Sequence, residues 1–145
     1  MKVAKLCTQR VVSAPASSSL AEVVALMYGE RVGCVVVTRL SEGKPRVVGV
    51  ITDRDIVRAQ LSRVADHSQL SLADTMTLDP LVVCEDDDTT SVLQRLRSRG
   101  VRRAPVVDRA GTLIGLISVD DLLQLVAREV ADLAAVVATG SGPLS

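Results

Sequence analysis

The chain has 145 residues, of which 48% are hydrophobic, and its 17 basic and 17 acidic residues give a formal net charge of zero. That length and apolar content suffice for one compact domain or two closely packed halves. A zero net charge gives no attraction to nucleic acid or to an anionic membrane, and the single aromatic residue, Tyr28, leaves no platform for stacking bases. We therefore expect neither a nucleic-acid partner nor a membrane partner.

The cysteine and histidine content indicates a reduced, cytoplasmic setting. Cys7, Cys34 and Cys84 form no C-x-x-C pair, and their odd number argues against a secreted disulfide scaffold. The first residues lack the apolar run of a signal peptide, and no stretch approaches the roughly 20 apolar residues of a membrane span. The single histidine, His67, lies in a polar stretch and supports neither a metal site nor a catalytic dyad.

The first half of the chain begins with a short extended run, Val11 and Val12, followed by serines at 17–19. Serine is a favoured helix N-cap. The apolar residues that follow recur at i, i+3, i+4 and i+7, the spacing of a helix with one buried face. The sequence therefore predicts a helix over 19–29.

Two strands are predicted next, at about 33–38 and 47–52, because both runs are rich in valine. The segment between them, 39–46, is interpreted as a surface loop whose turn contains Gly43. The second strand leads directly into another helix. The first half therefore reads strand, helix, strand, strand, helix.

The second half repeats this order. An extended run at 81–83 precedes the acidic run 85–88, a helix is predicted over 88–99, and strands follow at 103–107 and 113–118. Four acidic residues in a row resemble a metal site at first sight. Carboxylates at a helix start also interact favourably with its positive end, and this capping role is the simpler interpretation because serines occupy the same place in the first half.

The last helix is predicted to be longer than its counterpart, with an extension over 129–138 and a disordered tail at 139–145. Its apolar residues fall on roughly one face, which would be core or subunit interface rather than a membrane anchor. These residues are Leu122, Leu123, Val126, Val130, Leu133, Ala134 and Val137.

One motif occurs in both halves at the junction of the last strand and the last helix. It consists of a glycine, a hydroxyl residue three positions later and an aspartate three positions after that. The two copies are offset by 115 − 49 = 66 positions and contain Gly49, Thr52 and Asp55 in the first half and Gly115, Ser118 and Asp121 in the second. The chain is therefore predicted to be a duplication, with repeats at 3–62 and 72–128 joined by a linker at 63–71.

Two interpretations of the motif remain open. The hydroxyl and the aspartate can simply form a capping box that satisfies free amides at the helix start. That interpretation leaves the glycine unexplained, since glycine weakens a strand and often marks close approach by a ligand or another backbone. A helix N-terminus is also a natural phosphate site, and a carboxylate can bind a ribose diol. The combination fits a nucleotide site.

With these residues in place, the sequence resembles the paired cystathionine-β-synthase (CBS) domains, or Bateman modules. The resemblance covers about residues 3–127 and rests on the doubled motif, on the repeated order of elements and on the segment 103–108. It implies an α+β fold in which two βαββα units pack sheet to sheet about a pseudo-twofold axis. It also implies two clefts that hold an adenosine-containing ligand.

The resemblance assigns roles to individual residues. Asp55 and Asp121 would bind ribose, and Thr52 and Ser118 would lie near phosphate. Weaker candidates for the walls around adenine are Val11, Val12, Val35, Val82, Val83 and Pro105. AMP, ADP or ATP is the expected ligand, with S-adenosylmethionine or NAD as further possibilities, and no cofactor is required.

The two clefts are not expected to be equal. Arg102 and Arg103 align with Gly33 and Cys34, so the strand of the second repeat alone offers cations. Neighbours on a strand point to opposite faces, so one arginine at most would face a cleft. In the first repeat, Arg54 and Arg58 can also reach phosphate. One cleft is predicted to prefer a phosphorylated ligand, and the other is predicted to be weaker or empty.

The resulting hypothesis is a stand-alone regulatory sensor and not an enzyme, because the sequence offers no activated nucleophile or metal cluster. The alternative is a structural or protein-interaction module with empty clefts, whose motifs are only helix caps. An enzyme or nucleic-acid binder with an unrecognised site is the third hypothesis. We expect a homodimer, formed through the apolar helix faces, and a regulated protein partner that the sequence does not identify.

Overall fold

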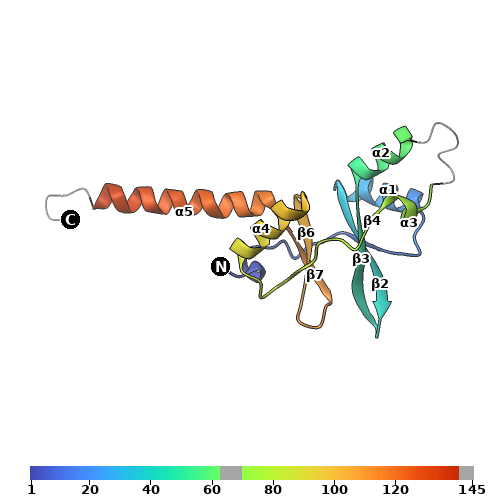
Figure 1. Ribbon diagram of the computed structural model, residues 1–145, viewed down its shortest axis with the longest axis horizontal. Helices are drawn as coiled ribbons and strands as arrows, with labels where there is room; N and C mark the ends of the chain where they lie inside the picture. Colours follow the sequence, from blue (N-terminus) through green and yellow to red (C-terminus); the bar gives the residue numbers. More distant parts are fainter. Residues whose placement is uncertain (63–69, 141–145) are drawn as a thin grey trace.

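The computed structural model describes residues 1–62 and 70–140, so His67 and most of the predicted linker and tail lie outside the described residues. Two β-sheets face one another, with helices on the outer side of each, which confirms the α+β class (Figure 1). The first half contains a 3-10 helix η1 (Val3–Lys5), β1 (Ser13–Pro15), α1 (Leu20–Glu30), β2 (Cys34–Ser41), β3 (Lys44–Thr52) and α2 (Asp53–Ser62). The remainder contains α3 (Leu72–Thr75), β4 (Thr77–Leu78), β5 (Val83–Cys84), α4 (Thr89–Arg99), β6 (Arg103–Val107), β7 (Leu113–Ser118) and α5 (Val119–Thr139).

The two sheets have the same local topology. In the first, β1 runs parallel to β2, β2 is antiparallel to β3, and β4 adds to the far edge of β3. In the second, β5 runs parallel to β6 and β6 is antiparallel to β7. The predicted order of strand, helix, strand, strand and helix is therefore present in both halves.

The helix boundaries follow the predicted caps. Ser19 accepts a hydrogen bond from the backbone N–H of Glu22 at 3.1 Å and starts α1, whereas Asp88 accepts from the N–H of Thr90 at 3.1 Å and starts α4. A short side chain with an oxygen satisfies an amide that the first turn leaves free. At the other end, Gly100 takes a left-handed conformation with φ of 65° and terminates α4.

The predicted loop at 39–46 is wrong in one respect, because most of it is strand. β2 continues to Ser41 and β3 begins at Lys44, which leaves Glu42 and Gly43 as a two-residue turn. Their φ angles are 53° and 76°. Positive φ at both positions gives the turn that matches strand twist in a hairpin. The extra residues of the first repeat therefore lengthen the hairpin.

The first strand of each half also begins later than predicted. β1 starts at Ser13, just after Val11 and Val12, although the carbonyl of Val12 still accepts from the N–H of Val36 at 3.0 Å. β5 consists of Val83 and Cys84 and not the predicted 81–83. Both shifts lie within the usual uncertainty of element boundaries.

Each sheet and its outer helices enclose a hydrophobic core, and each core is completed by a segment from the other half. Val3, at the start of the chain, is fully buried in the core of the second sheet. Leu72 and Met76, at the start of the second repeat, pack in the core of the first. The crossing segments also extend the sheets, because Thr8 pairs with Leu116 of β7 as β4 pairs with β3.

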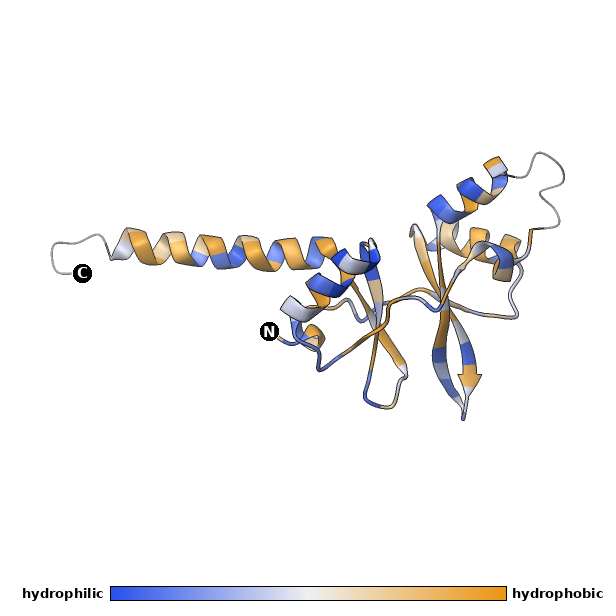
Figure 2. Cartoon of the chain, viewed as in Figure 1, coloured by the Kyte–Doolittle hydropathy of each residue, from blue (hydrophilic) through white to orange (hydrophobic). Residues whose placement is uncertain are grey.

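α5 extends far beyond the rest of the molecule (Figure 1). Leu122 is its only buried residue, whereas the side chains of Val130 and Leu133 are 59% and 66% exposed. Apolar residues recur along the whole projecting helix (Figure 2). Beyond its first turn, the predicted apolar face of α5 therefore packs against neither hydrophobic core. None of the described helices is long and apolar enough to cross a bilayer.

Candidate functional site

The repeated motif forms a capping box at the start of α2 and of α5. In the first, the N–H of Thr52 donates to Oδ2 of Asp55 at 2.9 Å and the N–H of Asp55 donates to Oγ1 of Thr52 at 3.1 Å. In the second, the corresponding distances between Ser118 and Asp121 are 2.9 and 3.2 Å. The predicted capping role of the hydroxyl and the aspartate is therefore present in both repeats.

Each capping box uses only one of the two carboxylate oxygens of its aspartate. Within the described residues, Oδ2 of Asp55 and of Asp121 accepts hydrogen bonds, whereas Oδ1 accepts none. A carboxylate oxygen accepts more than one hydrogen bond when it is ionised. Capping and binding of a hydroxyl-rich ligand are therefore compatible at both positions.

The motif glycines make room for the crossing segments. A Cβ on Gly115 would lie 2.7 Å from the carbonyl oxygen of Thr8 and 3.2 Å from Sγ of Cys7. A Cβ on Gly49 would lie 2.8 Å from Sδ of Met76 and 3.0 Å from the Thr77 carbonyl oxygen. Close approach by a second backbone, one of the two reasons that the sequence suggested, therefore explains the glycines without a ligand.

We call the junction of the β-hairpin and the following helix in each repeat a corner. The first corner comprises Gly33, Cys34, Thr52, Asp53 and Asp55, and the second comprises Arg102, Arg103, Ser118, Val119 and Asp121. Cys34 pairs with Thr52 in the first sheet, and Arg103 pairs with Ser118 in the second. The same backbone arrangement thus carries different side chains.

Strand alternation directs the corners toward the space between the sheets. Val35 and Val37 belong to the first core, so Cys34 and Val36 lie on the other face of β2, toward the second sheet. By the same alternation, Arg103 and Pro105 lie on the face of β6 opposite the core residues Ala104 and Val106. β3 and β7 are in contact, and Arg103 of the second corner lies beside Cys34 of the first.

Arg103 lies beside Cys34 of the other repeat. Burial raises the pKa of the Cys34 thiol, and the nearby Arg103 guanidinium opposes that rise, whereas the carboxylates of Asp55 and Asp53 add to it. The cation that the alignment assigned to the second repeat therefore projects toward the first corner. Only the docking of the two halves brings it there.

The other predicted arginines occupy different places. Arg102 forms an exposed ion pair with Asp120, with 3.5 Å between Nη2 and Oδ1. Arg58 and Asp55 line a cavity of about 340 Å³ between α2 and α3. Arg54, the next residue after Asp53, is exposed. Arg102 and Arg103 therefore have different neighbours, because Arg103 lies beside Cys34.

Two of the predicted adenine walls are core residues. Val35 is 0% exposed in the first core and Val83 is 1% exposed in the second. Val12 also packs against the first core. Pro105 is fully buried on the inner face of β6, whereas Val11 and Val82 are half-buried. A run of valines does not reveal in the sequence which face of a short strand meets the core.

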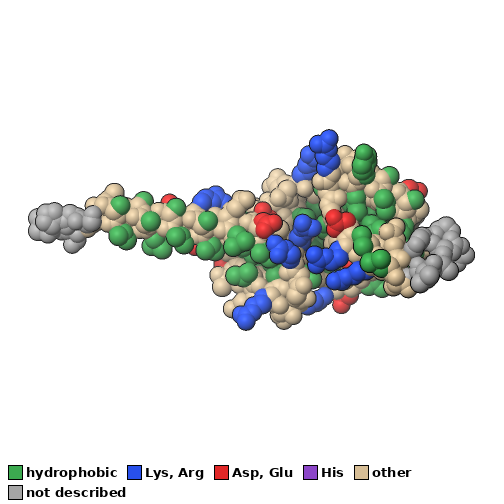
Figure 3. Space-filling view, turned by 90° about the horizontal axis from the view of Figure 1, so that it is seen from above, with side chains coloured by type: hydrophobic (Ala, Val, Ile, Leu, Met, Phe, Trp, Pro, Cys, Tyr) green, Lys and Arg blue, Asp and Glu red, His purple; other side chains and the backbone are tan. Residues whose placement is uncertain are grey.

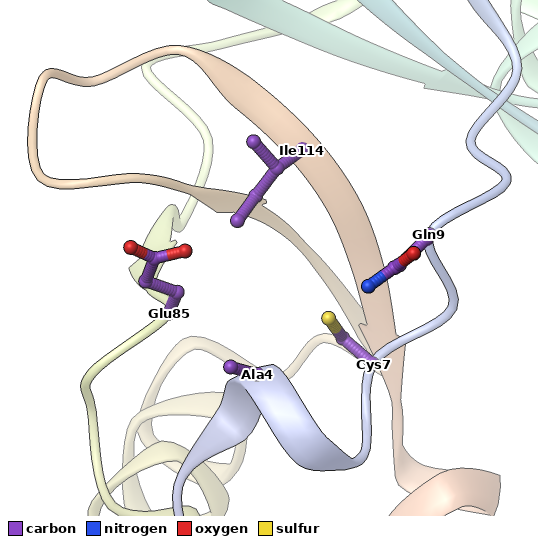
Figure 4. Close-up of a pocket in the computed structure, with 5 residues that line it drawn as sticks. All are labelled: Ala4, Cys7, Gln9, Glu85 and Ile114. Carbon is purple, nitrogen blue, oxygen red and sulfur yellow. The ribbon is translucent and has the colours of Figure 1, made fainter.

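A second cavity, of about 420 Å³, was not predicted. Figure 4 shows its lining residues, which come from the N-terminal segment, the end of β5 and β7: Ala4, Cys7, Gln9, Glu85 and Ile114. Burial raises the pKa of the Cys7 thiol, and the carboxylates of Asp121 and Glu85 add to the rise. The lining includes a carboxylate and no cation, so it does not suit a phosphate group.

The acidic run 85–88 has separate partners rather than a common metal. Asp88 caps α4, Asp87 accepts from Arg95 at 2.9 Å, and Asp86 accepts from Arg109 at 2.6 Å. The Arg109 hydrogen bond holds the pKa of Asp86 below its usual value. No group of three or more metal-binding side chains occurs among residues 1–62 and 70–140. The predicted capping role is confirmed for Asp88.

Comparison with known proteins agrees with this architecture. The model of the CBS domain family matches residues 3–62 and 72–128. An uncharacterized 17.7 kDa protein from Acidianus ambivalens is 33% identical over 121 residues, which are 83% of this chain and 70% of that protein.

Solved structures share the fold. The CBS domain protein PAE2072 from Pyrobaculum aerophilum, complexed with AMP, is 27% identical, with a TM-score of 0.73 over 88% of this chain and 99% of that one. The CBS domain pair of protein MJ0100, in complex with 5-methylthioadenosine and S-adenosyl-L-methionine, is 19% identical, with a TM-score of 0.74 over 89% and 98% of the two chains. The doubled motif, the facing sheets and these matches together show that this chain belongs to the CBS domain family, as a pair of CBS repeats.

Proposed function

We propose that this chain is a regulatory module that binds an adenosine-containing ligand at the two corners, with AMP, ADP or ATP as the first choice. The observation that carries the proposal is the pair of helix starts on facing sheets, each with a motif aspartate whose Oδ1 has no partner within the described residues. PAE2072, a CBS protein of similar fold, binds AMP. S-adenosylmethionine and NAD contain the same adenosine group and remain further candidates.

In this proposal, Asp55 and Asp121 accept hydrogen bonds from ribose hydroxyls. Thr52, Ser118 and the free amides of the following helix lie near phosphate, where the positive end of the helix favours an anion. The guanidinium of Arg103 supplies positive charge for the phosphate. The half-buried side chains of Val11 and Val82 remain candidates for contacts with adenine.

The proposed consequence of binding is regulatory rather than catalytic. Both aspartates already serve as helix caps, and none of the described residues forms a nucleophile and base pair at the corners. A ligand changes packing only if it binds one arrangement of the two halves better than another. The corners lie where the halves meet, so a bound ligand would contact both.

The capping boxes favour a second candidate function, an interaction module without a ligand. In that case, the hydroxyl and the aspartate are present only to start α2 and α5. The two functions predict different effects of an added ligand on stability. A ligand-binding module is stabilised by its ligand, whereas an interaction module with empty corners is not.

The test is thermal and chemical unfolding of nucleotide-free protein with AMP, ADP, ATP, NAD and S-adenosylmethionine. A ligand at about 100 times its dissociation constant should stabilise the protein by about 2.7 kcal/mol. Asp55→Asn and Asp121→Asn should each remove the stabilisation from the affected corner. Ser19→Ala is the matched control, because it removes a cap of similar worth, about 1 kcal/mol, from α1. If no compound stabilises the wild-type protein, the interaction module becomes the better explanation.

We also propose that the module is a homodimer that pairs through α5. Five exposed apolar residues of this helix are spaced alternately by three and four positions, and they are Leu123, Val126, Val130, Leu133 and Val137. This spacing is the heptad pattern of a coiled coil, in which a second copy of the same stripe is a suitable partner. Burial of this apolar stripe against a second copy would stabilise the projecting helix.

A further inference from the structure

The cavity of about 420 Å³ between the N-terminal segment, β5 and β7 shares no lining residue with either corner. Its walls are held by backbone hydrogen bonds. The N–H of Ala4 donates to the carbonyl oxygen of Glu85 at 3.0 Å, and the N–H of Glu85 donates to the carbonyl oxygen of Val107 at 2.8 Å. Figure 4 shows the lining side chains around one common space. The cavity is therefore held open by the fold, and its volume is within the range of small-molecule sites.

The equivalent place in the first repeat is filled by a methionine. Met76 stands 69 positions after Cys7 and packs in the first core. The two side chains have the same neighbour, because a Cβ on Gly49 would lie 2.8 Å from Sδ of Met76, whereas a Cβ on Gly115 would lie 3.2 Å from Sγ of Cys7. The shorter cysteine therefore leaves space that the methionine fills in the first repeat.

A second wall of the cavity also differs between the repeats. Val48 and Ile114 are equivalent, because each is the unpaired residue of a bulge in its hairpin. Ala16, which packs against the first core, corresponds to Glu85, 69 positions later. The second repeat therefore has a carboxylate and an open space where the first repeat has apolar packing.

The carboxylate of Glu85 is half-buried and has no cationic partner within 4.0 Å among residues 1–62 and 70–140. Each of the three aspartates that follow, 86–88, pairs with a cation. Arg109 is near Glu85, but its Nε donates to Asp86 at 2.6 Å. On the face shown in Figure 3, acidic side chains likewise lie beside basic ones over the middle of the molecule. Glu85 departs from this pairing, so its charge is available to a cationic ligand.

The other lining groups offer hydrogen bonds and apolar surface but no positive charge. Burial raises the pKa of the Cys7 thiol, and the carboxylates of Asp121 and Glu85 add to the rise, so the thiol is uncharged at neutral pH. The side-chain carbonyl of Gln9 can accept a hydrogen bond, and Ile114 offers apolar surface. A hard metal ion needs more oxygen ligands than this lining provides. An ammonium group needs only a carboxylate and another acceptor.

We propose that this cavity binds a small primary ammonium compound, and that the site does not depend on nucleotide binding at the corners. The ammonium group donates charge-assisted hydrogen bonds to the Glu85 carboxylate and a further hydrogen bond to the side-chain carbonyl of Gln9. The aliphatic part of the compound lies against Ile114. The N-terminal segment forms one wall and also completes the second core through Val3, so a bound compound stabilises the attachment of that segment.

The test is a titration of the intact, isotope-labelled chain with n-butylammonium chloride, followed by the backbone amide signals in NMR spectra. The signals of Ala4, Cys7, Glu85 and Ile114 should shift along one saturable curve. The uncharged n-butanol should bind at least about tenfold more weakly, because it cannot form the charge-assisted hydrogen bond. Sodium chloride at the same ionic strength is the blank titration.

Two pairs of variants examine the walls of the cavity. Cys7→Met introduces the residue that fills the equivalent place in the first repeat, so it should weaken n-butylammonium binding at least tenfold. Cys7→Ala is its control, because it leaves the cavity open, and it should change the dissociation constant by less than threefold. Glu85→Gln removes the charge and should also weaken binding at least tenfold. Glu129→Gln removes the same charge from an exposed position on α5 and should have no effect.

Three outcomes would overturn the proposal. The wild-type protein gives no saturable shift, or binds n-butanol as well as n-butylammonium. Glu129→Gln weakens binding as much as Glu85→Gln, which would mean that the ammonium ion only screens surface charge. Cys7→Met binds like the wild-type protein, which would place the ion pair outside the cavity. A thermal unfolding curve verifies that each variant folds, and Glu85→Gln keeps the test decisive if Cys7→Met does not fold.

Discussion

At the scale of single residues, the motif glycine is explained by contacts from the opposite end of the chain. The carbonyl oxygen of Thr8 occupies the space beside Gly115 and accepts a hydrogen bond from the N–H of Leu116 at 2.9 Å. Because this backbone bridge fixes Thr8, the oxygen cannot retreat from an added methyl group without loss of the bridge. Gly115 is therefore needed for packing whether or not a ligand binds nearby.

The corresponding prediction compares two glycine substitutions. Gly115→Ala should lower the free energy of unfolding by about 1–3 kcal/mol, the usual cost of overpacking. Gly29→Ala is the control, because Gly29 lies in α1 with nothing within 4 Å of its would-be Cβ. Alanine there should add up to about 1 kcal/mol through helix propensity. Chemical denaturation measures both, and equal effects would contradict the packing role of Gly115.

At the scale of elements, the crossing segments join the two repeats into one folding unit. η1 belongs to the first repeat in sequence but packs with the second in space, and α3 and β4 do the opposite. Neither core is complete without residues from the other half. The two halves should therefore unfold together in a single cooperative transition.

Substitution of Val3 tests this exchange. Val3→Ala should lower the free energy of unfolding by about 2 kcal/mol, since it removes buried methyl groups from a filled core. Hydrogen exchange at the Leu116 amide, which donates to Thr8, should accelerate. Lys5→Ala, in the same helix but exposed, should stay within about 0.5 kcal/mol of wild type. If Val3→Ala behaves like Lys5→Ala, the N-terminal segment contributes little to the second core.

At the scale of the whole molecule, both cores are filled by buried apolar side chains, whereas α5 leaves most of its own apolar residues exposed. The side chains of Leu123, Val126 and Val137 are 59%, 50% and 71% exposed. A monomer keeps this apolar stripe in water, so it lacks the stabilisation that burial of the stripe would provide. Pairing of two α5 helices would bury the stripe and fix the distance between the two modules.

The corresponding prediction concerns the oligomeric state. Wild-type protein should sediment as a dimer at micromolar concentration, and Val130→Glu should weaken the dimer more than about tenfold, because it places a charge in the seam. Ala135→Glu adds the same charge outside the heptad stripe and should leave the dimer intact. Analytical ultracentrifugation distinguishes these outcomes. A monomeric wild-type protein across this range would remove the proposed interface.

The sequence by itself determined the features that depend on neighbours a few positions apart. The caps Ser19 and Asp88, the capping boxes of Thr52 and Ser118, and the order of strands and helices all follow from local side-chain chemistry and apolar spacing. The doubled motif placed the chain in its family because identical local requirements recur in both halves.

Only the tertiary structure decided what depends on the docking of segments far apart in the chain. Arg103 reaches the first corner, Thr8 fills the space beside Gly115, and the apolar stripe of α5 lies outside both cores. Local propensities do not encode these contacts, because each depends on which faces of the two sheets meet and on which half receives the crossing segment.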